Sequence, residues 1–494
     1  MIAIIPLSPM PRILKSTSRW VGVAVLAAAV SACGGGGKTE KGETDEAVEA
    51  QFPVKDPFPS TYVAYTSTPT LIKNVTILTG TGDVIENGSV AMVDGKIAAV
   101  GTRIRTPKDA TVIDGAGKWV TPGIIDIHSH LGVYPSPSNR STSDGNEATS
   151  PNTAEVWAEH SVWPQDAGFT RALAGGITSL MVLPGSANLF GGRTITLKNV
   201  PSRTVQGMKF PGAPYGIKMA CGENPKRVYA SRGPATRMAS FAHYRRGWID
   251  AKAYKKKWAD YAEKIEKGGD DAKKAEPPKQ DLKLETLAGV LDGEITVHMH
   301  CYRADEMVQV LDMAKEFGYS VGTFHHGIEA YKIADFLSES EVCAAVWADW
   351  WGFKLEAYDT VGANAALIHD QPNGCAIIHS DSEVGIQMLN QEAAKAMASG
   401  QRAGIKIKPE EAIAWITLNP AKAMGIAEET GSLEEGKMAD LVVWTRDPFS
   451  VYAKAEKVFV DGALLYDRTE PARSPRMDFE LGQYENTFTG GAGQ

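Results

Sequence analysis

The feature that most constrains the fold is a repeated alternation of short apolar runs with helical segments between residues 123 and 425. Runs such as "GIIDIH", "ITSLMVLPG" and "EITVHMH" are each followed by a loop or a segment of helical pattern, for example "RADEMVQVLDMAKEFG". Strands that alternate with helices of about 10 to 15 residues favour βαβ units and a parallel sheet. The span holds about eight such units, so we expect an α/β fold in which residues 123–425 form a (β/α)8 TIM-type barrel.

Two β-rich segments flank this region. Residues 71–122 contain short strand-like runs, two of them separated by Asp94-Gly95, and residues 426–470 repeat the pattern around Asp461-Gly462. An Asp-Gly pair between alternating apolar residues is a strong hairpin signal. We expect one small β-sandwich domain assembled from both segments, with the barrel inserted between them. A charged stretch at about 245–285 is expected to form a helix and an exposed loop outside the barrel.

The first 32 residues have the pattern of a targeting segment. Basic residues precede the apolar run "WVGVAVLAAAV", which is too short to span a bilayer, and "VSAC" ends on Cys33. Small residues before a cysteine resemble a bacterial lipoprotein signal, in which that cysteine is lipidated; a plain signal peptide or an uncleaved anchor is the alternative. We expect residues 33–70 to be a flexible tether and residues 471–494 a C-terminal tail.

This N-terminus predicts a protein exported to a bacterial cell envelope, at the outer membrane or on the periplasmic face, and attached to the membrane through its N-terminal lipid. The chain has 494 residues, and its net charge of −8 gives no support for nucleic-acid binding. Four cysteines besides Cys33 lack CxxC spacing, so they do not predict a zinc ribbon and can either pair or stay buried. The sequence leaves the oligomeric state open.

Histidines gather at the ends of four predicted strands. Residues i and i+2 of a strand point to the same face, so each His-x-His pair aims two imidazoles into one space. The strands of a barrel end at one rim, which is where barrel active sites lie, so we expect a metal site there. The residues at these strand ends are His128 and His130, His298 and His300, His325 and His326, and His379 with Asp381.

In this order, the motifs "GIIDIHSH", "HMHCYRADEM", "HHGIEAYKIADF", "HSDSE" and "TLNPAKAMGI" resemble the metal-dependent amidohydrolase superfamily, in its imidazolonepropionase-like branch. The resemblance covers about residues 71–467. It implies that His128 and His130 bind the more buried metal ion, and that Asp381 binds the same ion and takes a proton from its water.

The resemblance also implies that His298 and His326 hold a second metal ion. In binuclear members a carboxylated lysine at the end of the fourth strand bridges the two ions; Lys218 fits that position, with Glu223 as the alternative ligand. A nitrogen and oxygen ligand set without thiolate suits one or two Zn²⁺ ions, with Mn²⁺, Co²⁺ or Fe²⁺ as replacements.

Other residues are candidates for substrate contact. His300 and His325 would either touch substrate or support the ligands, and Arg193 would either bind a substrate carboxylate or form a surface salt bridge. The segment "WADWWGFKLEAYD" places three tryptophans after the seventh predicted strand, where they would line an apolar substrate site or fill the mouth of the barrel.

The resemblance implies a hydrolase that uses metal-activated water to cleave an amide or related C–N bond in a small molecule, such as a dipeptide or a cyclic amide. A deaminase or a phosphotriester-type hydrolase on the same fold is one alternative. A non-catalytic surface lipoprotein that keeps the barrel as a binding module is an alternative of another class.

Overall fold

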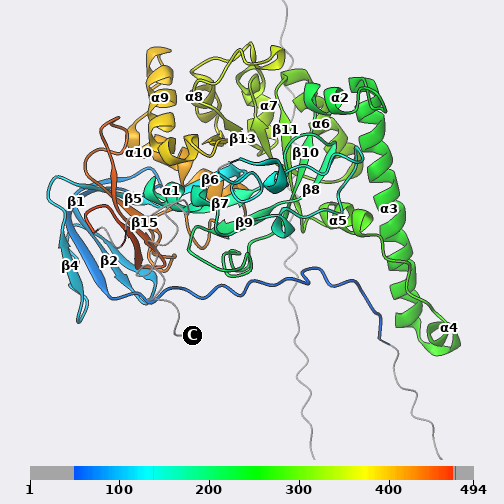
Figure 1. Cartoon of the computed structure of the whole chain (residues 1–494), viewed down its shortest axis with the longest axis horizontal. Helices are drawn as coiled ribbons and strands as arrows, with labels where there is room; N and C mark the ends of the chain where they lie inside the picture. Colours follow the sequence, from blue (N-terminus) through cyan, green and yellow to red (C-terminus); the bar gives the residue numbers. More distant parts are fainter. Residues whose placement is uncertain (1–48, 137, 471–472, 474–494) are drawn as a thin grey trace, which may run out of the picture. The chain divides into compact units, whose positions relative to one another are not determined.

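Strands from both ends of the described chain pair in one eight-stranded mixed sheet (Figure 1). The computed structural model describes residues 49–136, 138–470 and 473. The strand order is β17-β16-β15-β5-β1-β2-β3, with β4 beside β1. The bounds are β1 Thr70–Leu78, β2 Val84–Val93, β3 Lys96–Gly101, β4 Thr111–Asp114, β5 Trp119–Pro122, β15 Leu441–Trp444, β16 Ala455–Val460 and β17 Ala463–Asp467.

The two Asp-Gly pairs form the hairpins that the sequence predicts. Both residues of each pair have positive φ, 50° and 76° at Asp94 and Gly95, and 46° and 70° at Asp461 and Gly462. Positive φ at both central residues is what a two-residue type I′ turn requires, and it suits the twist of the flanking strands. The turns therefore set the antiparallel pairing of β2 with β3 and of β16 with β17.

The remaining strands form two further sheets, with the orders β14-β13-β12-β11-β10-β8 and β6-β7-β9. Their bounds are β6 Ile124–Ser129, β7 Ile177–Val182, β8 Phe190–Arg193, β9 Ile195–Lys198, β10 Gly216–Ala220, β11 Thr296–Cys301, β12 Val321–His326, β13 Cys343–Val346 and β14 Ala376–Ile378. Pairing is parallel between β6 and β7 and from β10 through β14. The fold is therefore α/β.

Two of these strands run against the expected parallel direction. β8 is antiparallel to β10, and β9 is antiparallel to β7. Only residues 183–189 separate β7 from β8, whereas a parallel crossover needs a dozen or more residues. β8 is therefore not the parallel neighbour of β7, and it pairs with β10 at the edge of the other sheet.

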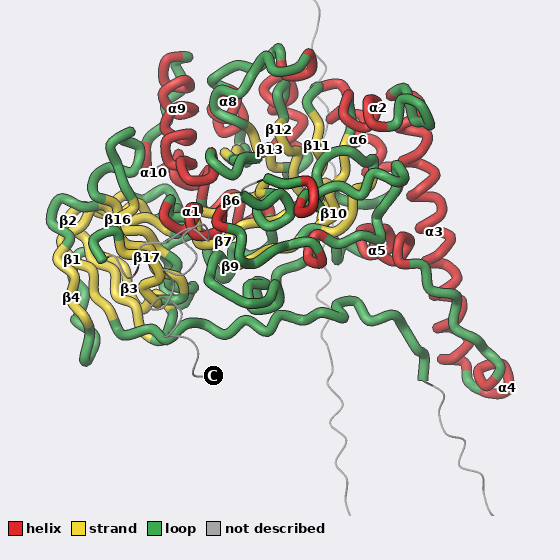
Figure 2. Tube along the Cα trace, in the orientation of Figure 1, coloured by secondary structure: helices red, strands yellow, loops and turns green. Residues whose placement is uncertain are grey.

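Helices flank the strands β10 to β14 (Figure 2). Their bounds are α1 Ala167–Ala174, α2 Glu223–Val228, α3 Arg237–Lys267, α4 Gly269–Lys273, α5 Leu282–Leu291, α6 Ala304–Phe317, α7 Ala334–Glu339, α8 Asn364–His369, α9 Leu389–Arg402, α10 Pro409–Ala412 and α11 Leu418–Ala423. The 3-10 helices are η1 Arg140–Thr142, η2 Ala158–His160, η3 Ala330–Ile333, η4 Leu355–Ala357, η5 Gly385–Met388 and η6 Ile413–Ile416. The charged stretch expected at 245–285 comprises the end of α3, α4, a non-helical segment at 274–281 and the start of α5.

Part of the segment expected to be a flexible tether is held against the part of the chain that contains β6 to β14, which we call the main domain. Lys209 Nζ donates to Phe58 O at 2.7 Å, Ser60 Oγ donates to Lys209 O at 2.6 Å, and Thr61 N donates to Gln206 O at 3.0 Å. The predicted signal segment and Cys33 lie outside the described residues, as does most of the predicted C-terminal tail. Among the described helices, none combines the length and apolar character needed to cross a membrane.

Two disulfides join neighbouring strands. Cys221–Cys301 links the carboxyl ends of β10 and β11, and Cys343–Cys375 links the amino ends of β13 and β14. The paired cysteines are 80 and 32 residues apart in the sequence, respectively. Cross-links of this kind stabilise a fold by about 2–4 kcal/mol each, largely by constraining the unfolded chain.

A fully buried lysine connects the main domain to the sheet formed by both chain ends. Lys198 Nζ on β9 lies 2.7 Å from Asp461 Oδ1 and 3.3 Å from both carboxylate oxygens of Asp440. All three side chains are buried, with Lys198 at 0% exposure. Burial raises the pKa of Asp440, although Lys198 opposes this change. The ammonium therefore balances charge that the interior would otherwise disfavour.

We expect Lys198→Met to lower the free energy of unfolding by about 3–5 kcal/mol, because two buried carboxylates lose their counter-ion. Urea unfolding followed by circular dichroism measures the change. Lys256→Met is the matched control, since Lys256 forms an exposed pair with Asp260 and its loss should leave the transition unchanged. Equal stability of the Lys198→Met variant and the wild type would contradict this role.

Candidate metal centre

Imidazole and carboxylate groups meet where β6, β12 and β14 end. Asp381 Oδ1 lies 3.6 Å from His128 Nε2 and 3.1 Å from His130 Nε2, and Asp381 Oδ2 lies 3.9 Å from His326 Nε2. Two overlapping sets of residues each offer three ligand atoms within 4.8 Å of one another. The first set is His128, His130 and Asp381, and the second is His128, His326 and His379. We call these five residues the histidine–aspartate cluster. Four of them, all except His379, are residues that the sequence predicts as metal ligands.

The backbone is strained at two members of this cluster. His326 and Asp381 have φ values of 74° and 47°, in the left-handed region that residues other than glycine rarely adopt. Such conformations cost of order 1–3 kcal/mol and concentrate at functional sites. Asp381 is held in place because its N–H donates to His128 O at 3.0 Å.

A chain of three imidazoles orients His128. His325 Nδ1 lies 2.8 Å from His128 Nδ1, and His325 Nε2 lies 3.0 Å from His298 Nδ1. Both ring nitrogens of His325 are thus engaged, which suits support of His128 rather than contact with substrate. His128 keeps Nε2 for the cluster, and burial lowers its pKa well below the usual value, so its ring is neutral.

His298, which the sequence predicts as a ligand of the second metal ion, faces away from the cluster. Its Nδ1 is bound to His325, and a Cβ at Gly216, near the start of β10, would lie 2.9 Å from its Nε2. Burial lowers the pKa of His298 to about 3. His300, two residues nearer the carboxyl end of β11, has its ring centroid 4.6 Å from that of His326. The structure therefore brings His300, and not His298, to the edge of the cluster.

His379 is a cluster member to which sequence reasoning assigns no role. Its ring lies 5.0 Å from the rings of His128 and His326. Neither ring nitrogen has a hydrogen-bond partner among the described residues, and burial lowers its pKa to about 3. The signal was present, because His379 and Asp381 have the same i, i+2 spacing as His128 and His130.

Lys218 lies beside the cluster. Its Nζ is 3.4 Å from His128 Nε2 and 3.2 Å from Pro184 O, and burial lowers its pKa to about 8. Glu223, the alternative ligand, lies elsewhere: its carboxylate is 31% exposed and 3.8 Å from Lys354 Nζ. Of the two candidates, the structure places only Lys218 against a cluster histidine.

Arg193 has other neighbours. Its guanidinium lies 4.1 Å from the ring centroid of Trp157, and Nε donates to Thr286 Oγ1 at 2.9 Å. No described contact joins Arg193 to the cluster. The structure does not bring this residue together with the histidines, and it gives no support to binding of a substrate carboxylate by Arg193.

An aromatic surface covers one side of the cluster. Trp347 stacks on His326 with ring centroids 4.3 Å apart, and Trp350 stacks on Trp347 at 5.2 Å. Phe353 meets Trp347 edge-on at 5.7 Å. Trp350 and Phe353 are exposed to solvent, so an apolar group that approaches His326 would meet these rings.

The cluster fits a divalent cation. Like His379, the cluster member His326 has a ring nitrogen, Nδ1, without a hydrogen-bond partner among the described residues. The same is true of Nδ1 of the neighbouring His300. Burial raises the pKa of Asp381, but its hydrogen bond to His130 and nearby positive charge outweigh this, so the pKa lies below the usual value and the carboxylate is ionised. Imidazoles with one carboxylate form a ligand set that suits Zn²⁺ or a similar ion.

Comparisons with known proteins agree on one family. The family model of the amidohydrolase family matches residues 356–465. The amidohydrolase tasK of Hapsidospora irregularis is 31% identical over 435 residues, 81% of this chain and 43% of that protein, so the chain spans less than half of that relative's length. Imidazolonepropionase of Shewanella sp. (strain ANA-3) is 26% identical over 386 residues, covering 73% of this chain and 87% of that one.

A solved structure extends this likeness to the fold. The crystal structure of an amidohydrolase from Thermotoga maritima MSB8 has a TM-score of 0.73 and 36% sequence identity, and the match covers 81% of this chain and 100% of that one. The similarity thus spans the whole of that relative. The chain belongs to the amidohydrolase family.

Proposed function

We propose that this chain is a metal-dependent hydrolase that cleaves an amide or related C–N bond in a small substrate. The observation that carries the proposal is the convergence of four imidazoles and the carboxylate of Asp381 from three strand ends into one space. A divalent cation held there supplies Lewis acidity toward a carbonyl group and activates water for attack.

The chain's own residues supply the proton transfer and the orientation. Asp381 is ionised and partly exposed at 24% of its side chain, so it is placed to accept a proton from water and to pass it to the leaving nitrogen. His325 fixes the ring of His128 through Nδ1. Lys218 Nζ lies 3.4 Å from His128 Nε2, so a carboxylated Lys218 would add oxygen ligands beside the cluster, and its lowered pKa favours the neutral amine that carboxylation needs.

The finer fold that we propose is a barrel closed between β14 and β6. Two hydrogen bonds support closure: Asp381 N donates to His128 O at 3.0 Å, and Ser380 N donates to Asp126 Oδ1 at 3.2 Å. On the other side, a single residue, Thr194, separates β8 from β9 and so links the two sheets. This arrangement brings all the strand ends that carry the cluster to one rim.

Zinc affinity tests the ligand set. After metal removal and titration with Zn²⁺ against a chelating dye, the wild type should bind about one to two equivalents. His379→Asn should weaken binding at least about tenfold, because it removes a buried nitrogen aimed at the cation. His160→Asn is the matched control, since His160 is exposed and stacks on Trp157. Unchanged zinc affinity of the His379→Asn variant would exclude it as a ligand.

A substrate panel tests the reaction. We expect the zinc-loaded protein to release a new carboxylate from dipeptides or lactams, and Asp381→Asn to lower kcat at least about 100-fold because the proton acceptor is lost. Release of ammonia without a new carboxylate would indicate a deaminase instead. Metal binding without turnover of amides, aminopyrimidines or phosphotriesters would favour a binding module.

We further propose that the chain is an exported lipoprotein of a bacterial cell envelope, anchored through Cys33. The two disulfides support export, because such bonds persist in oxidising compartments. In a bacterial host, labelled palmitate should enter the wild type and not the Cys33→Ser variant, and only the wild type should fractionate with membranes. Equal labelling of both proteins would refute lipidation at Cys33.

A further inference from the structure

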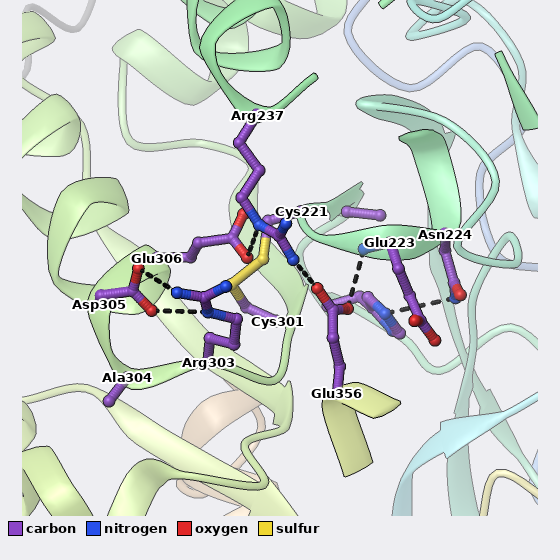
Figure 3. The surroundings of a disulfide bond; sticks show 12 residues. Cys221, Glu223, Asn224, Arg237, Cys301, Arg303, Ala304, Asp305, Glu306 and Glu356 are labelled. Carbon is purple, nitrogen blue, oxygen red and sulfur yellow. Dashed lines mark hydrogen bonds and ion pairs between the residues drawn. A yellow bond between two sulfur atoms is a disulfide. The ribbon is translucent and has the colours of Figure 1, made fainter. Parts of the chain in front are cut away.

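The loop after β13 is fixed to the rim of the site by a buried carboxylate. Glu356, in η4, accepts from the backbone N–H of Glu223 at 2.8 Å and pairs with Arg237, which also donates to Glu306 at 2.7 Å (Figure 3). A Cβ at Gly222 would lie 2.6 Å from Glu356 Oε2, so this close approach needs glycine. The loop is therefore held in one place relative to α2 and α3.

Lys354 lies two residues before Glu356, close to the histidines. Its Nζ is 4.3 Å from the ring centroid of Tyr302 and 3.1 Å from Asn224 Oδ1. Asn224 Nδ2 lies 3.3 Å from His300 Nε2, and the ring of Tyr302 is tilted against the rings of His300 and His326, with centroids 4.7 and 5.4 Å away. One amide side chain thus separates the ammonium from His300.

Carboxylates hold the ammonium of Lys354 less closely than that of the fully buried Lys198. Lys198 is held by two carboxylates at 2.7 and 3.3 Å, whereas the described hydrogen bond of Lys354 is to a neutral amide. Glu356 shares Arg237 with Glu306, and Glu223 forms only a long ion pair with Lys354, 3.8 Å from its Nζ, with 31% of its side chain exposed. An ammonium with three donors and 18% exposure of its side chain has capacity for an anion that approaches from solvent.

The geometry points to Lys354 as the residue that binds a carboxylate of the substrate while the scissile amide lies at the histidine–aspartate cluster. The surface formed by Trp347, Trp350 and Phe353 adjoins the same space and takes an apolar group. The substrate class is then a small peptide or N-acyl amino acid with a free carboxylate and an apolar side chain. This inference rests on the proposed C–N hydrolase function and adds its specificity.

Kinetics on a matched pair of substrates tests this assignment. A dipeptide that ends in phenylalanine and its C-terminal amide differ only in the carboxylate. We expect the wild type to prefer the acid at least about tenfold in kcat/KM, as a charge-assisted hydrogen bond implies. Lys354→Met should abolish this preference by raising KM for the acid while kcat for the acid changes little. Its kcat/KM for the amide should also change little. Lys354→Arg should keep most of it.

Lys332→Met is the control, because Lys332 pairs with Glu329 and Asp359 near the same loop without a described contact to the cluster. Its preference for the acid should equal that of the wild type. If Lys354→Met does not fold, Lys354→Gln replaces it. Equal use of acid and amide by the wild type, or an unchanged preference in the folded Lys354 variants, would overturn the assignment while the hydrolase function stands.

A binding measurement separates the two proposals. 3-Phenylpropanoate and 3-phenylpropan-1-ol contain no C–N bond, so calorimetric titration of the zinc-loaded protein does not depend on turnover. We expect the acid to bind about tenfold more weakly to Lys354→Met than to the wild type, with no change for the alcohol. Weaker acid binding without any amide hydrolysis would reject the hydrolase and keep the anion site. Equal acid binding by both proteins, or none to the wild type, would reject the anion site.

Discussion

The site depends on the contact between the first and the last strands of the main domain. The buried carboxylate of Asp126 accepts from the N–H of His128 and from both the N–H and the hydroxyl of Ser380. Burial raises the pKa of Asp126 to about 7, and the three hydrogen bonds oppose that change. Asp381 N–H adds a bond to His128 O. Because these bonds bring residues 126–130 against residues 379–381, imidazoles distant in sequence can share one cation.

Other cross-links hold the surrounding rim and the opposite end of the strands. The disulfide Cys221–Cys301 joins the carboxyl ends of β10 and β11, next to His300, and Cys343–Cys375 joins β13 and β14 at their amino ends. Lys198 binds the main domain to the sheet built from both chain ends. Rigid strands of this kind support a site whose ligands must keep their geometry, whereas we propose that the loop that carries Lys354 sets specificity.

The sequence predicted the strand-end positions of the cluster because i, i+2 spacing in a strand has a direct geometric meaning. It could not decide which histidine of a pair reaches the rim: His298 and His300 share a face, and only depth along β11 separates them. His379 was placed at a strand end but given no ligand role, although its spacing from Asp381 repeats the same pattern. The position of Arg193 was not predictable, because it follows from β8 running antiparallel to its neighbours.

The central claim is that the histidine–aspartate cluster binds a metal ion. The most direct measurement is anomalous diffraction at the zinc absorption edge from crystals of the zinc-loaded protein. The account predicts a peak about 2.0–2.2 Å from a ring nitrogen of His128 and from a carboxylate oxygen of Asp381. A zinc peak at another position, with the rings of the cluster hydrogen-bonded only to one another or to water, would contradict the account.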